Sequence, residues 1–200
     1  MTGKSWQFSS LLAVLGVVLL LAGPTLAGTV TGVVKLGTVV KDEDSHDLTA
    51  IQETYNIYEG FAVSNVLLNG TMGARGSFHL DLKDINRDNG QGLFTYRVQD
   101  AGKLSVKYGQ HRQLYDADGS VSSLRRDWRL GVSATPSRFV RLTGNFGHQA
   151  RTGDRLGYPV GTQSVLGGNY DYAVVTGNLS AEVHRNGRKA ALGWDTTRFN

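Results

Sequence analysis

Ser77-Phe-His-Leu-Asp-Leu-Lys83 and Leu93-Phe-Thr-Tyr-Arg-Val98 decide the fold, because apolar and polar side chains alternate along both segments. The same alternation returns in Leu104-Ser-Val-Lys-Tyr108 and in Trp128-Arg-Leu-Gly-Val-Ser133. Successive side chains leave a β-strand on opposite faces, so a period of two indicates strands with one apolar and one polar face. The sequence therefore predicts antiparallel sheet over residues 76–135.

Strand-like segments continue on both sides of this region and predict a sheet of about nine strands. Asn186-Gly187 is the strongest hairpin signal, because both central residues of a type I′ turn need a positive φ. Asn69-Gly70 and Thr135-Pro-Ser137 are also expected to be turns. Long connections are expected at His111–Arg126 and His148–Tyr170. The expected strands are 29–41, 61–69, 76–85, 92–99, one containing 104–108, one containing 128–133, 138–147, one ending at 179–184, and 188–199.

The N-terminus is predicted to be a helical signal peptide of residues 1–27, with the mature chain beginning near Gly28. Lys4 supplies the positive charge, Leu11 to Ala22 the apolar run, and Thr25-Leu-Ala27 the small residues of a cleavage site. The apolar run is shorter than the about 20 residues that a membrane-spanning helix needs. An uncleaved N-terminal anchor is the alternative. The pattern indicates export.

Composition narrows the class of protein further. The chain contains no Cys, which excludes disulfides, Cys-ligated metals and covalently attached c-type haem in these residues. The net charge of +4 is modest, and its basic residues form no cluster in the sequence, so a nucleic-acid partner is not expected.

Connection lengths alternate along the chain, being short after the second, fourth, sixth and eighth expected strands and longer after the others. Short turns on one rim and longer loops on the other are typical of outer-membrane β-barrels. A soluble sandwich would show the same alternation of faces. We favour an all-β, antiparallel, up-and-down transmembrane barrel of residues 28–200 in the bacterial outer membrane, in contact with its lipid.

The polar side of the expected strands carries the candidate functional residues. They predict a polar channel or a docking surface, although ordinary solvated residues paired with one another would look alike. His79 and Asp81 could begin a metal or acid–base site, but no converging ligands accompany them, so no metal is expected. The expected lumen-facing residues are His79, Asp81, Lys83, Arg97, Lys107, Arg129, Arg141, Glu182 and His184.

An enzyme is not expected, because the chain lacks the Gly-x-Ser-x-Gly, His-Glu-x-x-His and Walker-type signatures. The alternative is a barrel enzyme with an extracellular site in the two long connections. The groups that would serve such a site are His111, Asp116, Asp118, His148 and Asp154.

Three segments resemble the N-terminal part of the MtrB/PioB-type outer-membrane barrels: Gln52-Glu-Thr-Tyr-Asn-Ile-Tyr-Glu-Gly-Phe61, Gly76-Ser-Phe-His-Leu-Asp-Leu82 and Gly102-Lys-Leu-Ser-Val-Lys-Tyr108. That family forms porin-like sheaths around a multihaem c-type cytochrome and lets electrons cross the outer membrane. Some members carry a Cys-x-x-Cys near the mature N-terminus, which is absent here. Family barrels are also longer than this chain.

The resemblance implies a scaffold that sheathes a multihaem cytochrome and holds no cofactor of its own. A general or solute-selective porin is the alternative function. Single-chain bacterial barrels have even strand numbers, and an open sheet in lipid leaves costly unpaired backbone groups. We therefore expect an incomplete barrel, an open curved sheet in which residues 29–41 and 188–199 do not pair.

Overall fold

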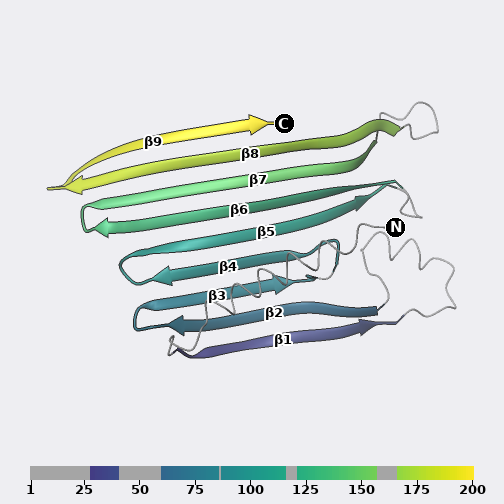
Figure 1. Ribbon diagram of the computed structural model, residues 1–200, viewed down its shortest axis with the longest axis horizontal. Helices are drawn as coiled ribbons and strands as arrows, with labels where there is room; N and C mark the ends of the chain where they lie inside the picture. Colours follow the sequence, from purple (N-terminus) through teal and green to yellow (C-terminus); the bar gives the residue numbers. More distant parts are fainter. Residues whose placement is uncertain (1–27, 41–59, 86, 116–120, 157–165) are drawn as a thin grey trace.

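The computed structural model describes residues 28–40, 60–85, 87–115, 121–156 and 166–200. These residues are all-β and form one antiparallel sheet of nine strands (Figure 1). No helix in the part described has the length and apolarity needed to cross a membrane. The strands are β1 (Val30–Val39), β2 (Gly60–Met72), β3 (Gly76–Lys83), β4 (Gln91–Val98), β5 (Gly102–Leu114), β6 (Ser122–Ser137), β7 (Val140–Leu156), β8 (Leu166–Arg185) and β9 (Arg188–Phe199).

The strands follow one another across the sheet in chain order, so the topology is up-and-down without a crossover. Within the described residues β1 pairs only with β2, and β9 pairs only with β8. The two strands lie at opposite edges of the sheet (Figure 1). The predicted open sheet, in which the first and last strands do not pair, is confirmed.

Short and long connections alternate between the two ends of the sheet, as the sequence predicts. Residues 73–75, 99–101, 138–139 and 186–187 join strands at one end, which we call the short-turn rim. In the last of these turns Asn186 has φ 50° and Gly187 has φ 72°, the positive values that a type I′ turn requires. The strand ends that the longer connections join are all at the opposite end.

The long connections predicted at His111–Arg126 and His148–Tyr170 are mostly strand, which corrects the sequence-based expectation. The ladder between β5 and β6 continues to Leu114 and Ser122, and β7 continues to Leu156 before β8 begins at Leu166. Most side chains there are polar, with only isolated apolar residues such as Leu114 and Leu124, so the alternation disappears while backbone pairing continues. Period-two patterning shows only where one face is apolar.

Two predicted turns are also wrong. Asn69-Gly70 lies inside β2, and the chain turns later, where Gly73 has φ 65°. Pro136 lies inside β6, next to a register shift between Ala134 and Ser137. Proline cannot donate to the ladder and is tolerated at such irregularities, so it marks a bulge here and not a turn.

Register sorts the side chains into two faces, because directly paired residues point to the same side of a sheet. The apolar face carries Phe78 and the polar face carries His79. Val33, Leu67 and Leu93 are apolar members of the polar face. The large side chains of the apolar face include Val30, Leu68, Phe78, Leu80, Leu82, Phe94, Tyr96, Val98, Leu104, Val106, Tyr108, Trp128, Leu130, Val132, Leu142, Phe146, Val175, Leu179, Leu192 and Trp194.

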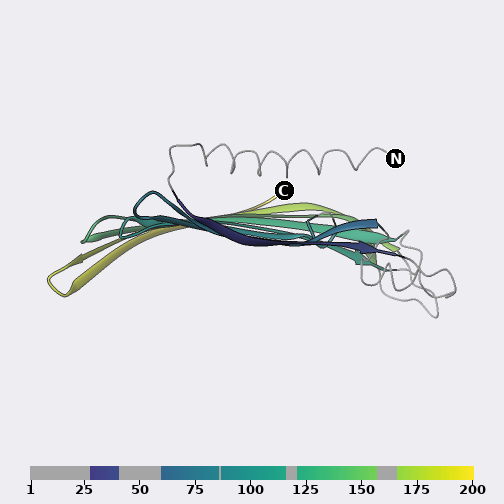
Figure 2. The same ribbon diagram turned by 90° about the horizontal axis from the view of Figure 1, so that it is seen from below.

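The sheet is a single twisted layer (Figure 2), and no second described layer covers either face. Ala62 and Leu80 are its only buried hydrophobic residues in the described ranges. Leu192 is 78% exposed and Trp194 is 58% exposed, although both belong to the apolar face. An amphipathic sheet needs something to cover its apolar side. The fold therefore leaves a large apolar surface to be covered.

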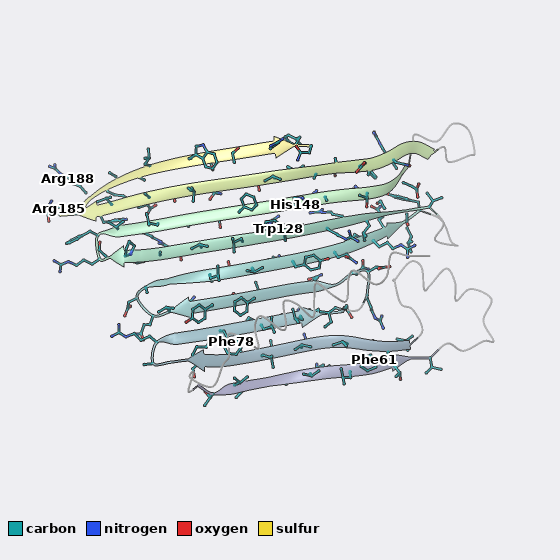
Figure 3. All side chains as sticks on the ribbon, in the orientation of Figure 1. Phe61, Phe78, Trp128, His148, Arg185 and Arg188 are labelled. Atoms are coloured by element: carbon teal, nitrogen blue, oxygen red, sulfur yellow. The ribbon has the colours of Figure 1, made fainter. Side chains whose placement is uncertain are left out.

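Aromatic rings mark where the apolar face ends toward the longer connections. Trp128 of β6 stacks on His148 of β7, with ring centroids 5.8 Å apart, and Figure 3 shows them on neighbouring strands. Tyr108 of β5 is the direct partner of Trp128. One step further along the same face, Gln110 accepts hydrogen bonds from the Tyr108 hydroxyl at 2.9 Å and from Arg126 Nε at 3.3 Å. The apolar surface gives way to polar groups at this row.

Candidate binding surface on the polar face

The residues predicted to line a lumen all lie on the polar face of the sheet. Lys107 pairs directly with Arg129, Arg141 with Glu182, and the remaining members follow by alternation along their strands. The register brings them to one side from six strands: His79, Asp81 and Lys83 on β3, Arg97 on β4, Lys107 on β5, Arg129 on β6, Arg141 on β7, and Glu182 and His184 on β8.

A row of mostly uncharged polar residues crosses the polar face on all nine strands and was missed in the sequence. It is visible only once the register aligns single residues of different strands. His79 Nδ1 lies 2.7 Å from Asn69 Oδ1, and Asn145 Nδ2 donates to Asn178 Oδ1 at 2.9 Å. The row consists of Thr31, Asn69, His79, Thr95, Ser105, Gly131, Asn145, Asn178 and Asp195.

His79 and Asp81 are each engaged by neighbours and not by one another. The His79 ring bonds to Asn69, as above. Asp81 Oδ1 accepts a hydrogen bond from Asn65 Nδ2 at 3.1 Å, while its Oδ2 lies 3.5 Å from Lys83 Nζ. Within the described ranges, His, Asp and Glu residues nowhere gather in a group of three that could hold a metal ion. These contacts make both residues part of a hydrogen-bonded surface.

Charge is distributed unevenly over the polar face. The Glu182 carboxylate forms an ion pair with Lys189 Nζ at 2.9 Å and lies 3.4 Å from His184 Nε2. By contrast, four cations of the polar face form no ion pair within the described part of the chain: Arg97, Lys107, Arg129 and Arg141. Lys103 belongs with these cations, because it is the direct partner of Arg97.

Lys103 was missed in the sequence because the apolar alternation of its strand begins only at Leu104. The spacing of Lys103 from Lys107 could have identified it, because residues four apart in a strand lie on the same face. The polar face is therefore more basic than the sequence pattern alone suggested.

Arg151 is the centre of a hydrogen-bond network on the polar face, at the end of the sheet opposite the short-turn rim. Its Nη2 donates to Tyr115 Oη at 2.8 Å, Gln113 Oε1 at 3.0 Å and Ser123 Oγ at 3.0 Å. The guanidinium also lies 3.9 Å from the ring centre of Tyr170. A single side chain thus links β5, β6, β7 and β8.

Among the described residues considered for an extracellular enzyme site, the two histidines lie on opposite faces of the sheet. His111 lies on the polar face of β5, whereas His148 lies on the apolar face of β7 against Trp128. Asp154 Oδ2 accepts a hydrogen bond from the Ser122 backbone N–H at 3.0 Å. Asp116 and Asp118 lie outside the described residues. The described members of the set occupy separate places and share no reaction centre.

The hollows of the surface lie mainly on the polar side. One at the short-turn rim, of about 1120 Å³, is lined by Arg75, Arg97, Lys103 and Arg141, with Asp100 among them. Another, of about 710 Å³, extends over β4–β9 and includes Lys103, Lys107 and Arg129. A hollow polar side opposite an apolar side matches a barrel wall, whereas a sandwich would enclose its apolar side.

Comparisons of the chain with protein-family models, with curated proteins and with solved structures find no match.

Proposed function

We propose that the chain forms part of the wall of an outer-membrane β-barrel that sheathes a multihaem c-type cytochrome. Placement in a membrane is supported by one observation: the apolar face is uncovered and lies opposite a hollow polar face. Lipid would cover the apolar face without any further protein layer, and the polar face would line the lumen. Unpaired edges at β1 and β9 would need additional strands, because unpaired backbone groups are costly in lipid.

The sheathing role rests on the resemblance to the MtrB/PioB-type barrels. Of the segments that carry it, Gly76–Leu82 and Gly102–Tyr108 lie in β3 and β5, while most of Gln52–Phe61 lies outside the described residues. The chain itself would insulate and hold the cytochrome, and it would bind no haem. Export through a cleaved signal peptide of residues 1–27 belongs to the same proposal, and those residues are also outside the described ranges.

The membrane placement can be tested through tryptophan fluorescence. Trp128 and Trp194 lie on the apolar face, so brominated phospholipids should quench their emission in reconstituted vesicles. The matched control replaces Trp6, Trp128 and Trp194 by Phe and introduces Thr95→Trp on the polar face. That variant should be quenched by aqueous iodide and spared by brominated lipid. A native chain that stays in the supernatant after carbonate washing, unquenched by brominated lipid, would refute the proposal.

A porin is the second candidate function, and the excess of unpaired cations on the polar face favours it. Rings of Arg and Lys select anions in known pores. Purification from native membranes separates the two functions. Co-purification of a haem-staining protein would support the sheath, whereas anion-selective conductance of the barrel without such a protein would support the porin.

A further inference from the structure

Three pairs of cations lie directly opposite one another on the polar face. Arg125 and Arg151 form the pair nearest the longer connections, and the other two pairs lie closer to the short-turn rim. Arg97 of β4 is the partner of Lys103 of β5, and Lys107 of β5 is the partner of Arg129 of β6. Like charges at directly opposed positions destabilise an antiparallel pair of strands. No carboxylate in the described residues forms an ion pair with any of the four cations in these last two pairs. The sheet therefore holds positive charge that its own described side chains leave unneutralised.

The Arg97–Lys103 and Lys107–Arg129 pairs are separated by one polar row and line two hollows that share Lys103. Arg97 and Lys103 line the hollow at the short-turn rim together with Arg141, and Lys103 also lines the next hollow with Lys107 and Arg129. Lys103 and Lys107 are four residues apart in β5, which corresponds to about 13 Å along a strand. We call Arg97, Lys103, Lys107, Arg129 and Arg141 the basic track.

Few carboxylates lie near the basic track, and Glu182, the direct partner of Arg141, already forms an ion pair with Lys189 at 2.9 Å. Asp100 lines the outer hollow, and Asp127 and Asp195 line the inner one. Asp127 already lies 3.9 Å from Arg125 Nε. Cations therefore outnumber carboxylates in both hollows, and the local field favours an anionic ligand.

We propose that the basic track docks a carboxylate-rich segment of a protein held against the polar face. A single phosphate is too small to neutralise cations spread over more than about 13 Å of strand. Lipid would cover the opposite, apolar face with its acyl chains, so its headgroups would lie beyond the ends of that band and not over the polar face. Carboxylates at successive positions of a partner can meet guanidinium and ammonium groups in turn, and the Arg members can bind them through two hydrogen bonds. This inference rests on the proposed sheathing function and names the chemistry by which the sheathed partner is recognised.

Binding of a fluorescein-labelled oligoglutamate peptide to the detergent-solubilised full chain tests the proposal, with fluorescence anisotropy as the readout. The double variants Arg97→Gln/Lys103→Gln and Lys107→Gln/Arg129→Gln should each bind about tenfold more weakly than the native chain. Added salt should weaken the native interaction, because screening reduces attraction between exposed charges.

The matched control is Arg185→Gln/Arg188→Gln. These residues are also directly opposed cations, but they belong to the β8–β9 hairpin and to the apolar side of the register (Figure 3). The control removes the same charge from another like-charge pair and should leave peptide affinity unchanged. An equal loss in the control would indicate attraction by net charge alone and would overturn the proposal.

Three further results would overturn it. Native binding by both track variants would show that these cations do not hold the peptide. Competition by inorganic phosphate at matched charge concentration would identify a small-anion site, as expected for a porin. Quenching by brominated lipid is measured on the same variants. Intact quenching without peptide binding by the native chain removes this inference alone, whereas absent quenching removes the proposed membrane placement.

Discussion

The ring of Phe78 on β3 lies over Gly70 on β2, in the space that a side chain at position 70 would occupy. The two residues are direct cross-strand partners on the apolar face, so a large ring fills the gap left by the missing side chain. Placing an aromatic ring against a glycine in this way protects an otherwise weak point of a sheet.

Gly70→Ala is therefore expected to lower the free energy of unfolding by about 1–3 kcal/mol, the usual cost of overpacking. The new methyl group would force Phe78 away from its present position. Urea unfolding in detergent micelles, followed by far-UV circular dichroism, measures the change.

Gly37→Ala in β1 serves as the control for that experiment. A Cβ at Gly37 would meet only Ser64 Oγ, at 3.9 Å, which is ordinary van der Waals contact. Replacing this strand glycine should be neutral or slightly stabilising. Equal losses in the two variants would contradict the steric explanation.

Lys103→Glu is expected to stabilise the sheet by about 0.2–1 kcal/mol, because it turns a like-charge pair with Arg97 into an opposite-charge pair. The same variant should lose affinity for oligoglutamate. Lys83→Glu is the comparison, since it removes the Lys83–Asp81 ion pair of 3.5 Å and should not stabilise. An unchanged stability would show that the two side chains do not interact, and destabilisation by Lys103→Glu would contradict the expected repulsion between Arg97 and Lys103.

Arg151→Ala is expected to cost about 1.5–3 kcal/mol, the range for hydrogen bonds made by a charged group. The substitution removes the donor shared by Gln113, Tyr115 and Ser123. Limited proteolysis should then cleave near the ends of β5–β8 faster than in the native chain.

Arg125→Ala is the control for the Arg151 variant, because it also removes one guanidinium. Arg125 is 47% exposed and lies 3.9 Å from Asp127, so its removal should change stability by less than about 0.5 kcal/mol. If both arginine variants behaved alike, the Arg151 network would not be a significant source of stability.

The absence of Cys makes the chain suitable for site-directed labelling. Thr95 and Phe94 are neighbours in β4 with side chains on opposite faces. In outer-membrane preparations a membrane-impermeant maleimide should modify Thr95→Cys from the lumen and leave Phe94→Cys unmodified. Equal labelling of both positions in folded protein would indicate that neither face is covered by lipid.

The centre of each strand was predictable because one face of it is apolar. Ser77–Lys83 and Leu93–Val98 alternate without interruption, and the structure places them in β3 and β4. The outer parts of β5 and β7 were not predictable, because most side chains on both faces there are polar and nothing in the pattern separates a ladder from a loop. Backbone hydrogen bonds, which leave no trace in composition, hold those extensions.

Membership of the polar face could be read from single strands, but contacts across it could not. His79 and Asp81 were identified as neighbours on one face, while their actual partners, Asn69 and Asn65, come from another strand. Cross-strand partners depend on register, which the turn residues set. The pairing of Arg97 with Lys103 follows from the tight connection at 99–101, where Asp100 has φ 61°.

Strand order equal to chain order has a kinetic consequence. Every strand of the described sheet meets only its neighbours in sequence, so each hairpin requires the closure of one connection and no distant encounter. The entropy lost on closing a loop grows with its length, and the tight turns at 138–139 and 186–187 are the least demanding. Assembly can thus proceed by adding one hairpin at a time to an existing edge. The last strand added always presents the template for the next, whether that strand belongs to the same chain or to another.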